Sequence, residues 1–252
     1  MLRKLGLSKE YQRARLVTND REVLRLRREL LVCRNNQDTS RCRKLLGQIR
    51  EKISLDIPEN RQYLTELEAS LDWMEGKISK EEFAAREEQA LNCTLNTDNI
   101  FGANEMYLTE MEILCIRKKM DVLEGNDKSR YIEFCMRFFE LIEKKCELAD
   151  YISMYEFVMV YIASELGNIG EYQLAFEIDQ KILSKCMACK RVWVLDDIIY
   201  NILWNQKEKH RKAGKLIEKQ KMTEGLKQCV LLSHFCKRSF YEKFYQEKLH
   251  QS

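Results

Sequence analysis

A single proline, Pro58, occurs in a chain of 252 residues that also holds only nine glycines. An ordinary protein of this length contains about twelve prolines and about eighteen glycines, because turns, hairpins and strand ends require them. Sandwich, barrel and Gly-rich phosphate-binding folds are therefore not expected. The hydrophobic fraction of 45% is enough for an extensive core, so long disordered stretches are not expected either. These features predict a nearly all-helical protein.

Apolar residues recur at helical spacing from about Asp20 onward, and no run of residues alternates as a strand does. Short polar breaks separate the helical patterns near residues 34–38, 76–79, 96–104, 125–128, 167–170 and 188–190. Several breaks carry helix-start residues. We expect Ser79 and Glu82 to cap each other's amides, Asp38 and Asp127 to act as N-caps, and Pro58 to occupy a first helical turn.

The breaks at Asn36, Gly76, Gly125 and Gly170 follow one another at intervals of 40, 49 and 45 residues. Each would end one helix and precede another, so the repeating unit is a helical hairpin. Because one hairpin cannot bury its apolar stripe on both sides, such units stack side by side. About five hairpins are expected, and the predicted core includes the residues Leu45, Trp73, Phe83 and Tyr172.

The stretch from Met159 to Ala175 resembles one tetratricopeptide hairpin. Ala163 stands where that motif has a small residue, Gly170 stands at its turn, and Tyr172 and Ala175 stand on its second helix. The chain departs from the motif at three positions, which are Leu166 in place of an aromatic residue, Asp179 in place of a large apolar residue, and Ile182 in place of alanine. The resemblance implies an all-α, tetratricopeptide-like helical-hairpin array that forms a right-handed superhelix.

Together with the segment Ile199–Asn205, this hairpin makes the chain similar to the C-terminal half of bacterial peptide-responsive helix-turn-helix regulators of the Rgg and PlcR kind. The opening segment Leu2–Tyr11 resembles the linker that follows their DNA-binding domain. We therefore expect a linker-like segment at 1–19 and a helical repeat domain at 20–252. The family's DNA-binding head is not represented in these residues, so direct DNA binding by this chain alone is not expected.

Charge is distributed unevenly although the net charge is only +3. Residues 1–61 contain sixteen basic and eight acidic side chains, whereas residues 62–115 contain three and twelve. Arg21, Arg25 and Arg28 share one helix side, with Glu22 and Glu29 interleaved. Mixed charge of this kind favours a solvated or partner-facing stripe over a phosphate-binding one. It also suits contact with the acidic segment 62–115, within the array or across a dimer.

No pattern of residues indicates catalysis or metal binding. Cys186 and Cys189 form the one CxxC motif, without two further ligands at zinc-site spacing, and His210, His234 and His250 lack triad partners. The ten cysteines are interpreted as small hydrophobic residues kept reduced. No segment approaches the roughly 20 apolar residues of a membrane span, and no signal sequence is recognised. We expect a cytoplasmic protein that is not an enzyme and has no cofactor.

Asparagine on a groove-lining helix suits peptide capture, because its amide offers both a donor and an acceptor to an extended backbone. Asn168, Asn201 and Asn205 are such candidates, and inter-helix packing is the alternative interpretation. By analogy with the hairpin motif, further concave-face residues are expected on the preceding helix, and Arg191 or Lys190 is a candidate partner for a peptide carboxylate. The predicted peptide-binding residues are Phe157, Val160, Ser164, Asn168, Arg191, Asn201 and Asn205.

The resemblance implies a cytosolic domain of a transcriptional regulator in quorum sensing, which dimerises and binds a short signal peptide in its concave groove. An aromatic last helix, with Phe235, Phe240, Tyr241, Phe244 and Tyr245, suggests that a second copy covers it as a homodimer. The alternative is a helical-repeat adaptor that holds a protein partner in the same groove or on the acidic 62–115 surface. An enzyme and a nucleic-acid binder rank below both.

Overall fold

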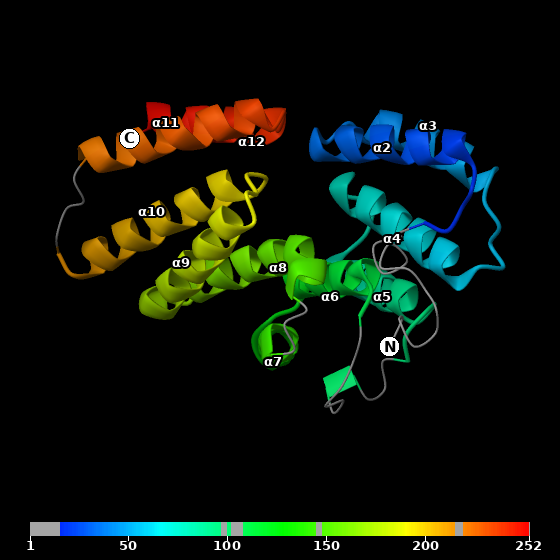
Figure 1. Cartoon of the computed structure of the whole chain (residues 1–252), viewed down its shortest axis with the longest axis horizontal. Helices are drawn as coiled ribbons and strands as arrows, with labels where there is room; N and C mark the ends of the chain where they lie inside the picture. The colour runs from blue at the N-terminus through cyan, green and yellow to red at the C-terminus, as the bar shows by residue number, and fades with distance from the viewer. Residues whose placement is uncertain (1–15, 97–99, 102–107, 145–147, 215–218, 252) are drawn as a thin grey trace. The chain divides into compact units, whose positions relative to one another are not determined.

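A computed structural model of the chain describes residues 16–96, 100–101, 108–144, 148–214 and 219–251. Within them the protein is all-α, without a β-strand, and its helices pack in neighbouring pairs (Figure 1). The all-α helical-hairpin array predicted from the sequence is thus confirmed. The helices are α2 (Arg21–Asn35), α3 (Thr39–Arg50), α4 (Pro58–Met74), α5 (Lys80–Leu91), α6 (Glu110–Val122), α7 (Gly125–Lys144), α8 (Leu148–Asn168), α9 (Tyr172–Ala188), α10 (Leu195–Lys212), α11 (Lys219–Phe235) and α12 (Ser239–His250).

The contacts divide the chain into two compact units, residues 1–154 and residues 155–252, and the boundary falls within α8. Unit 1 contains α2 to α7, and unit 2 contains α9 to α12. The domain predicted at 20–252 therefore comprises two units. A right-handed superhelix over the whole array stays a prediction.

Most of the predicted linker, residues 1–15, lies outside the described residues. Residues 16 and 17 are anchored to unit 1. The buried Asn60 side chain accepts a hydrogen bond from the Val17 N–H (2.8 Å) and donates to the Val17 carbonyl (3.1 Å). Leu16 is buried beside it. Residues 16 and 17 are therefore part of the packed structure of unit 1.

Five helices end in the same type of turn. A residue with φ between 53° and 92° follows the helix, and the next N–H donates to the carbonyl five residues back at 2.8–3.0 Å. This is the Schellman arrangement, in which a left-handed residue satisfies the last helical carbonyls. The left-handed residues are Gln37, Gly76, Gly170, Lys190 and Lys237. The predicted breaks at Gly76 and Gly170 are thus confirmed as tight hairpin turns.

The predicted helix starts are confirmed in part. Asp38 accepts a hydrogen bond from the Arg41 N–H (3.1 Å), and Pro58 opens α4, as predicted. Ser79 accepts from the Glu82 N–H (3.2 Å), but the Glu82 carboxylate pairs with Arg86 (2.6 Å) instead of forming the reciprocal cap. The prediction for Asp127 is wrong, because α7 begins at Gly125, which places Asp127 inside the first turn. There the carboxylate faces the positive end of the helix dipole.

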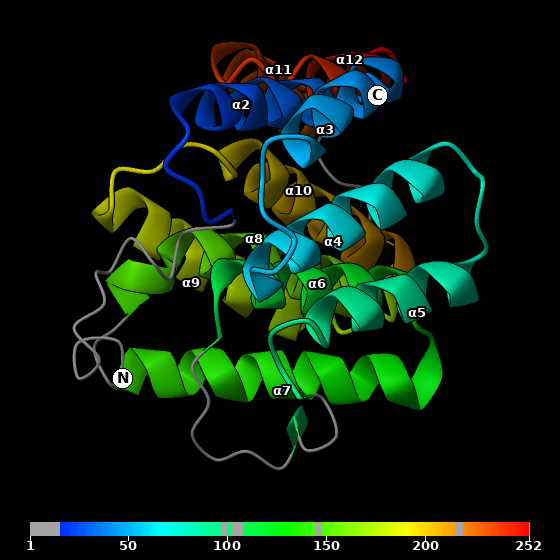
Figure 2. The same ribbon diagram turned by 90° about the vertical axis from the view of Figure 1, so that its right-hand side faces the viewer.

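The core of unit 1 contains two of the three residues predicted for it. Leu45 and Phe83 are buried, whereas Trp73 is 36% exposed and stacks on Phe83 with the ring centroids 5.3 Å apart. Trp73 lies in the last turn of α4, where no further helix covers it completely. The long helix α7 packs against α6 (Figure 2). Its aromatic stripe of Tyr131, Phe134, Phe138 and Phe139 is buried.

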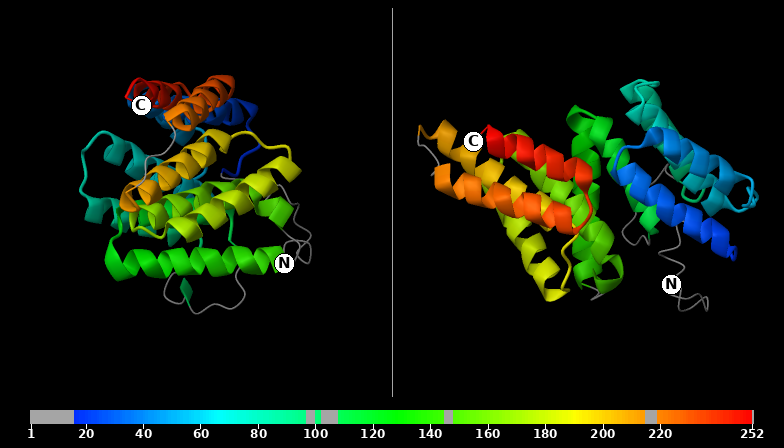
Figure 3. Two further views of the ribbon diagram at one scale, coloured as in Figure 1. Left: turned by 90° about the vertical axis from the view of Figure 1, so that its left-hand side faces the viewer. Right: turned by 90° about the horizontal axis from the view of Figure 1, so that it is seen from above.

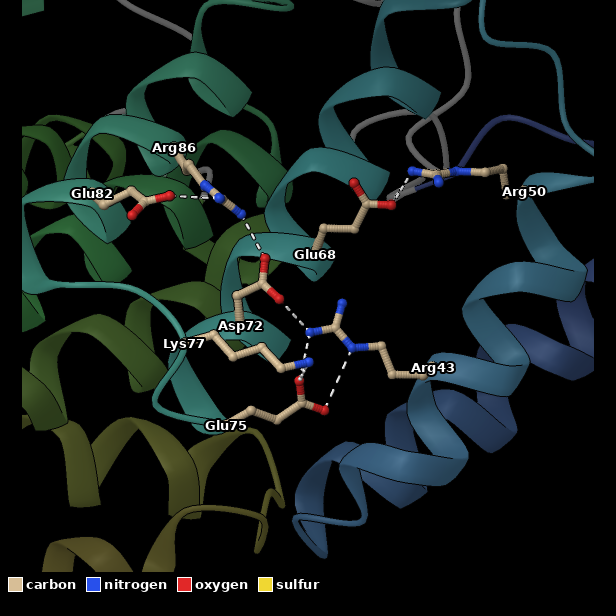
Figure 4. A network of polar contacts seen from close by, with 8 residues as sticks. All are labelled: Arg43, Arg50, Glu68, Asp72, Glu75, Lys77, Glu82 and Arg86. Atoms are coloured by element: carbon tan, nitrogen blue, oxygen red, sulfur yellow. Dashed lines mark hydrogen bonds and ion pairs between the residues drawn. The ribbon is translucent and has the colours of Figure 1, made fainter.

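Unit 1 also joins its basic and acidic segments. Arg43 on α3 binds Asp72 on α4 and Glu75 just after it, with the Arg43 Nη2 2.8 Å from Glu75 Oε2, and Arg50 binds Glu68 (Figure 4). Arg86 on α5 extends the network from Asp72 (2.6 Å). Among the described residues, the ion pairs between segments 1–61 and 62–115 are made by Arg34, Arg43 and Arg50. Contact of the acidic segment with the stripe that starts at Arg21 stays a prediction.

Unit 2 stacks its helices in chain order, with α10 against α9 and α11, and α12 against α11 (Figure 3). The buried Arg238 joins the last pair to α10. Its guanidinium lies 2.5 Å from Asp196 Oδ1 and 2.8 Å from Asp197 Oδ2, and Ser233 donates to Asp196 at 2.6 Å. Because both charges of the Asp196–Arg238 pair are buried, this pair fixes the start of α10 against the turn between α11 and α12.

Candidate functional site

Two adjoining hollows run along α10 in unit 2, between α9 on one side and α11 on the other. Phe176, Gln206 and Lys221 line both hollows, so together they form one groove, named here the α9–α11 groove. The groove exists because α10 packs against both of its sequence neighbours while the side chains of its intervening face are only half-buried. Concave sites of this kind are where folded proteins usually bind small ligands and peptides.

The larger hollow, of about 660 Å³, is named the apolar hollow. Ile199, Ile202 and Leu203 of α10 form its floor with Phe176 of α9. Its rim is polar, with Gln180, Gln206, Gln220, Gln228, Lys221 and Glu224. Gly225 of α11 also lines it, and a Cβ there would lie 2.4 Å from Leu203 Cδ1, so the glycine allows α11 to approach α10 closely.

The smaller hollow, of about 410 Å³, is named the basic hollow. It lies at one end of the groove, between the first turns of α9 and α11 and the last turn of α10. Lys209, His210 and Lys221 line it with Tyr172, Gln173, Phe176, Asn205, Gln206 and Ala213, a set that contains no acidic residue. The prediction that Tyr172 belongs to the core is wrong, because its ring is only half-buried and forms this wall.

A buried polar cluster, formed by Asp179 of α9 with Asn201 and Asn205 of α10, lies between the helices of unit 2. Asp179 is fully buried, and burial raises the pKa of its carboxyl to about 8, although the amides of Asn201 and Asn205 act to lower that pKa. Asn201 donates to the Val160 carbonyl of α8 (3.1 Å). The Asn205 amide points at Gly167, where a Cβ would lie 2.0 Å from Asn205 Oδ1.

The polar atoms of this cluster are poorly satisfied. Among the described residues, neither Asp179 oxygen and neither polar atom of the Asn205 amide has a hydrogen bond of good geometry. At neutral pH Asp179 is therefore protonated, because its pKa is about 8, and an ionised carboxylate would lack adequate compensation there. The cluster holds α8, α9 and α10 at a close separation, as the glycine at 167 permits.

Of the seven predicted peptide-binding residues, Asn205 is the one that lines the α9–α11 groove. Two of the three asparagines bond to neighbouring protein groups, since Asn201 bonds to α8 and Asn168 donates to Glu165 (3.4 Å). Arg191 pairs with the buried Glu156, with Nε 2.6 Å from Oε1. The others lie half-buried on α8, and they are Phe157, Val160 and Ser164. Peptide contact by these residues stays a prediction.

Sequence reasoning missed the groove-lining glutamines and lysines because the motif analogy placed the ligand on the first helix of the hairpin. A signal was nevertheless present. Tyr172, Phe176 and Gln180 recur at i, i+4 and i+8, which places two aromatic rings and an amide on one helix face. On α10, Ile199, Ile202 and Gln206 share one helix face at i, i+3 and i+7. A helix face that combines aromatic side chains with glutamine amides is typical of the partly buried wall of a groove.

The buried cysteine side chains are part of the packed interior. Burial raises the pKa of the Cys135, Cys186 and Cys229 thiols to about 12, so these cysteines stay protonated and unreactive. Cys189 is exposed, so the two cysteines of the CxxC motif differ in environment. In the part of the chain that the structure describes, no cluster of His, Cys, Asp and Glu has the makings of a metal site. Nor does any described helix have the length and apolarity to cross a membrane.

Comparison of the chain with protein-family models, curated proteins and solved structures finds no match. The site is therefore interpreted from its own geometry.

Proposed function

We propose that this protein is a binding module that receives a short extended peptide in the α9–α11 groove. The observation that carries the proposal is the lining of the groove, in which apolar floor residues lie beside a series of amides. Phe176, Ile199 and Ile202 offer apolar surface to peptide side chains, and Gln180, Gln206 and Gln228 offer donors and acceptors to a peptide backbone.

The length of the groove supports a ligand of several residues. Its lining on α10 extends from Ile199 to Ala213. At 1.5 Å per helical residue this is roughly 21 Å, which an extended peptide of about six residues spans. Such a ligand is short enough to leave the rest of unit 2 uncovered.

The test is fluorescence anisotropy with a pool of random heptapeptides carrying an N-terminal fluorophore and free C-termini. Peptides retained by the full chain are sequenced, resynthesised and titrated. Phe176→Ala removes surface from both hollows and is expected to weaken binding at least tenfold. Leu174→Ala is the matched control, because Leu174 is an exposed apolar residue on the same helix outside the lining. A pool from which no peptide is retained, or an equal loss in both variants, would contradict the proposal.

The resemblance of residues 159–175 and 199–205 to the C-terminal half of peptide-responsive regulators supports a role for this module in a cell. We propose that the chain is the ligand-sensing and dimerisation part of a cytoplasmic transcriptional regulator, and that a bound peptide shifts its conformational population. An in-frame helix-turn-helix sequence encoded immediately upstream would support this role. The alternative of an adaptor that holds a partner on the acidic 62–115 surface has less support. Asp72, Glu75 and Glu68 of that surface are already paired with arginines of the same unit.

An apolar face on α11 and α12 supports homodimerisation as a second property. Leu231 and Phe235 lie one turn apart on α11 and are 68% and 74% exposed, and Phe240 of α12 is 42% exposed. The aromatic residues of the last helix are otherwise covered within the chain. Tyr245 is buried, and Phe244 packs on Tyr200 with ring centroids 5.4 Å apart.

Sedimentation of the protein at tens of micromolar tests the dimer. We expect a dimer that Phe235→Glu converts to a monomer, while Lys227→Glu, an exposed substitution on the same helix, leaves it intact. A monomeric wild type would remove the proposal.

A further inference from the structure

The two hollows of the α9–α11 groove differ in charge, and this difference assigns a direction to the ligand. The basic hollow is lined by Lys209, His210 and Lys221 without an acidic residue. The apolar hollow is lined by one cation, Lys221, and one anion, Glu224, and otherwise presents apolar and amide groups. An anionic group is therefore stabilised at one end of the groove and has no comparable partner at the other.

The position of the basic hollow shows which part of a peptide meets these cations. It lies where α10 ends at Lys212 and where α9 and α11 begin. A peptide whose side chains fill the apolar hollow has one of its ends there. An N-terminal ammonium group would meet Lys209 and Lys221 as a like charge, which is unfavourable, whereas a C-terminal carboxylate would accept hydrogen bonds from both.

We infer that the α9–α11 groove selects peptides with a free C-terminus, bound with the carboxylate in the basic hollow and the preceding apolar side chains in the apolar hollow. The chain direction of the ligand is then parallel to α10, from Ile199 toward Ala213. Lys212 supports this placement. Its ammonium group lies 4.9 Å from the ring centroid of Tyr172, which lines the basic hollow, and it adds positive charge at this end of the groove. This inference rests on the proposed peptide binding.

The test compares three forms of one heptapeptide selected from the random pool, titrated against the full chain. The first two forms carry the N-terminal fluorophore and are the free acid and the C-terminal amide. The third is the free acid with an acetyl group in place of the fluorophore, and its affinity is measured by competition. We expect amidation to weaken binding at least tenfold and N-terminal acetylation to change affinity less than twofold. The double variant Lys209→Gln/Lys221→Gln should bind the acid and the amide with equal affinity. Lys207→Gln is the matched control, because Lys207 is an exposed lysine of α10 outside the lining.

Three results would overturn the inference. Equal binding of the acid and the amide by the wild type would exclude recognition of the terminus. A persistent preference for the acid in the double variant would place the carboxylate elsewhere. If an aspartate at the penultimate position of the amidated peptide restored binding, the basic hollow would bind an acidic side chain rather than the C-terminal carboxylate. All three outcomes require a bound peptide, so they are distinct from failure of the proposed function, in which no peptide binds.

Discussion

Asp179 places an ionisable group in a site that disfavours its charge. The carboxyl has a pKa of about 8 in the folded protein, against 3.8 in the unfolded chain. Between these two values the folded state holds a proton that the unfolded state releases, so the free energy of unfolding falls as pH rises through this window. Below pH 4 both states are protonated and no penalty applies.

Asp179→Asn keeps the shape of the side chain and removes the ionisation. We expect the variant to be about 1–3 kcal/mol more stable than the wild type at pH 7, with a flatter pH dependence between pH 4 and pH 8. Urea unfolding across this range measures the difference. Glu177→Gln, at an exposed position of the same helix, is the control and should leave the wild-type slope unchanged. A variant with the wild-type slope would show that Asp179 is ionised in the folded protein.

Single residues also show where sequence reasoning succeeds and fails. Asp38 was predictable as a cap because a side chain that caps a helix acts within three residues of itself. The burial of Asp179 was visible only as a departure from the hairpin motif. Its partners Asn201 and Asn205 lie more than twenty residues away, and no local pattern connects residues that meet through packing.

At the scale of the helix, the left-handed turn residues determine how neighbouring helices meet. Gly170 has φ of 92°, whereas Lys190 takes φ of 53° with a full side chain. A non-glycine residue in this conformation carries a penalty of roughly 1 kcal/mol that glycine does not carry.

Lys190→Gly is therefore expected to raise the free energy of unfolding by about 0.5–1 kcal/mol, and Gly170→Ala to lower it by about 1–2 kcal/mol. The Cβ of an alanine at 170 would also lie 2.9 Å from Lys212 Nζ. Thermal and urea unfolding measure both effects. Lys207→Gly, at an exposed position inside α10, is the control and should destabilise by about 1 kcal/mol. Loss of stability in Lys190→Gly would contradict this account of the turn.

The helix boundaries at Gly76, Gly170 and Lys190 were predictable from polar breaks in the sequence, and glycine marks the turn at the first two. The turns at Lys190 and Lys237 use the same geometry without a glycine, so composition gives little sign of the left-handed residue. The site shows a similar division. The sequence indicated that helical hairpins would form a groove. Tertiary packing decides which helices line that groove, and the motif analogy had placed the lining on α8.

For the whole molecule, the division at residue 154 predicts that the effects of core substitutions stay within one unit. Arg238 provides the test, because burial works against its charge while Asp197 and Asp196 raise its pKa and hold it ionised. Arg238→Met leaves the buried Asp196 without its partner and should destabilise unit 2 by about 3–5 kcal/mol.

Hydrogen exchange measures where this destabilisation appears. We expect faster exchange in α10, α11 and α12 and little change in α2 to α5, and Lys243→Met, at an exposed position of α12, should match the wild type. Equal acceleration in both units would show that they unfold as one cooperative body.

The Schellman turn at Lys190 bears on the kinetics of the proposed peptide binding. A two-bond turn of this kind leaves the backbone between α9 and α10 little freedom, so this wall of the groove is preorganised before any ligand arrives. A peptide that enters then loses its own conformational entropy but imposes little ordering on that wall. Differences in affinity among ligands should consequently appear in their residence times more than in their association rates.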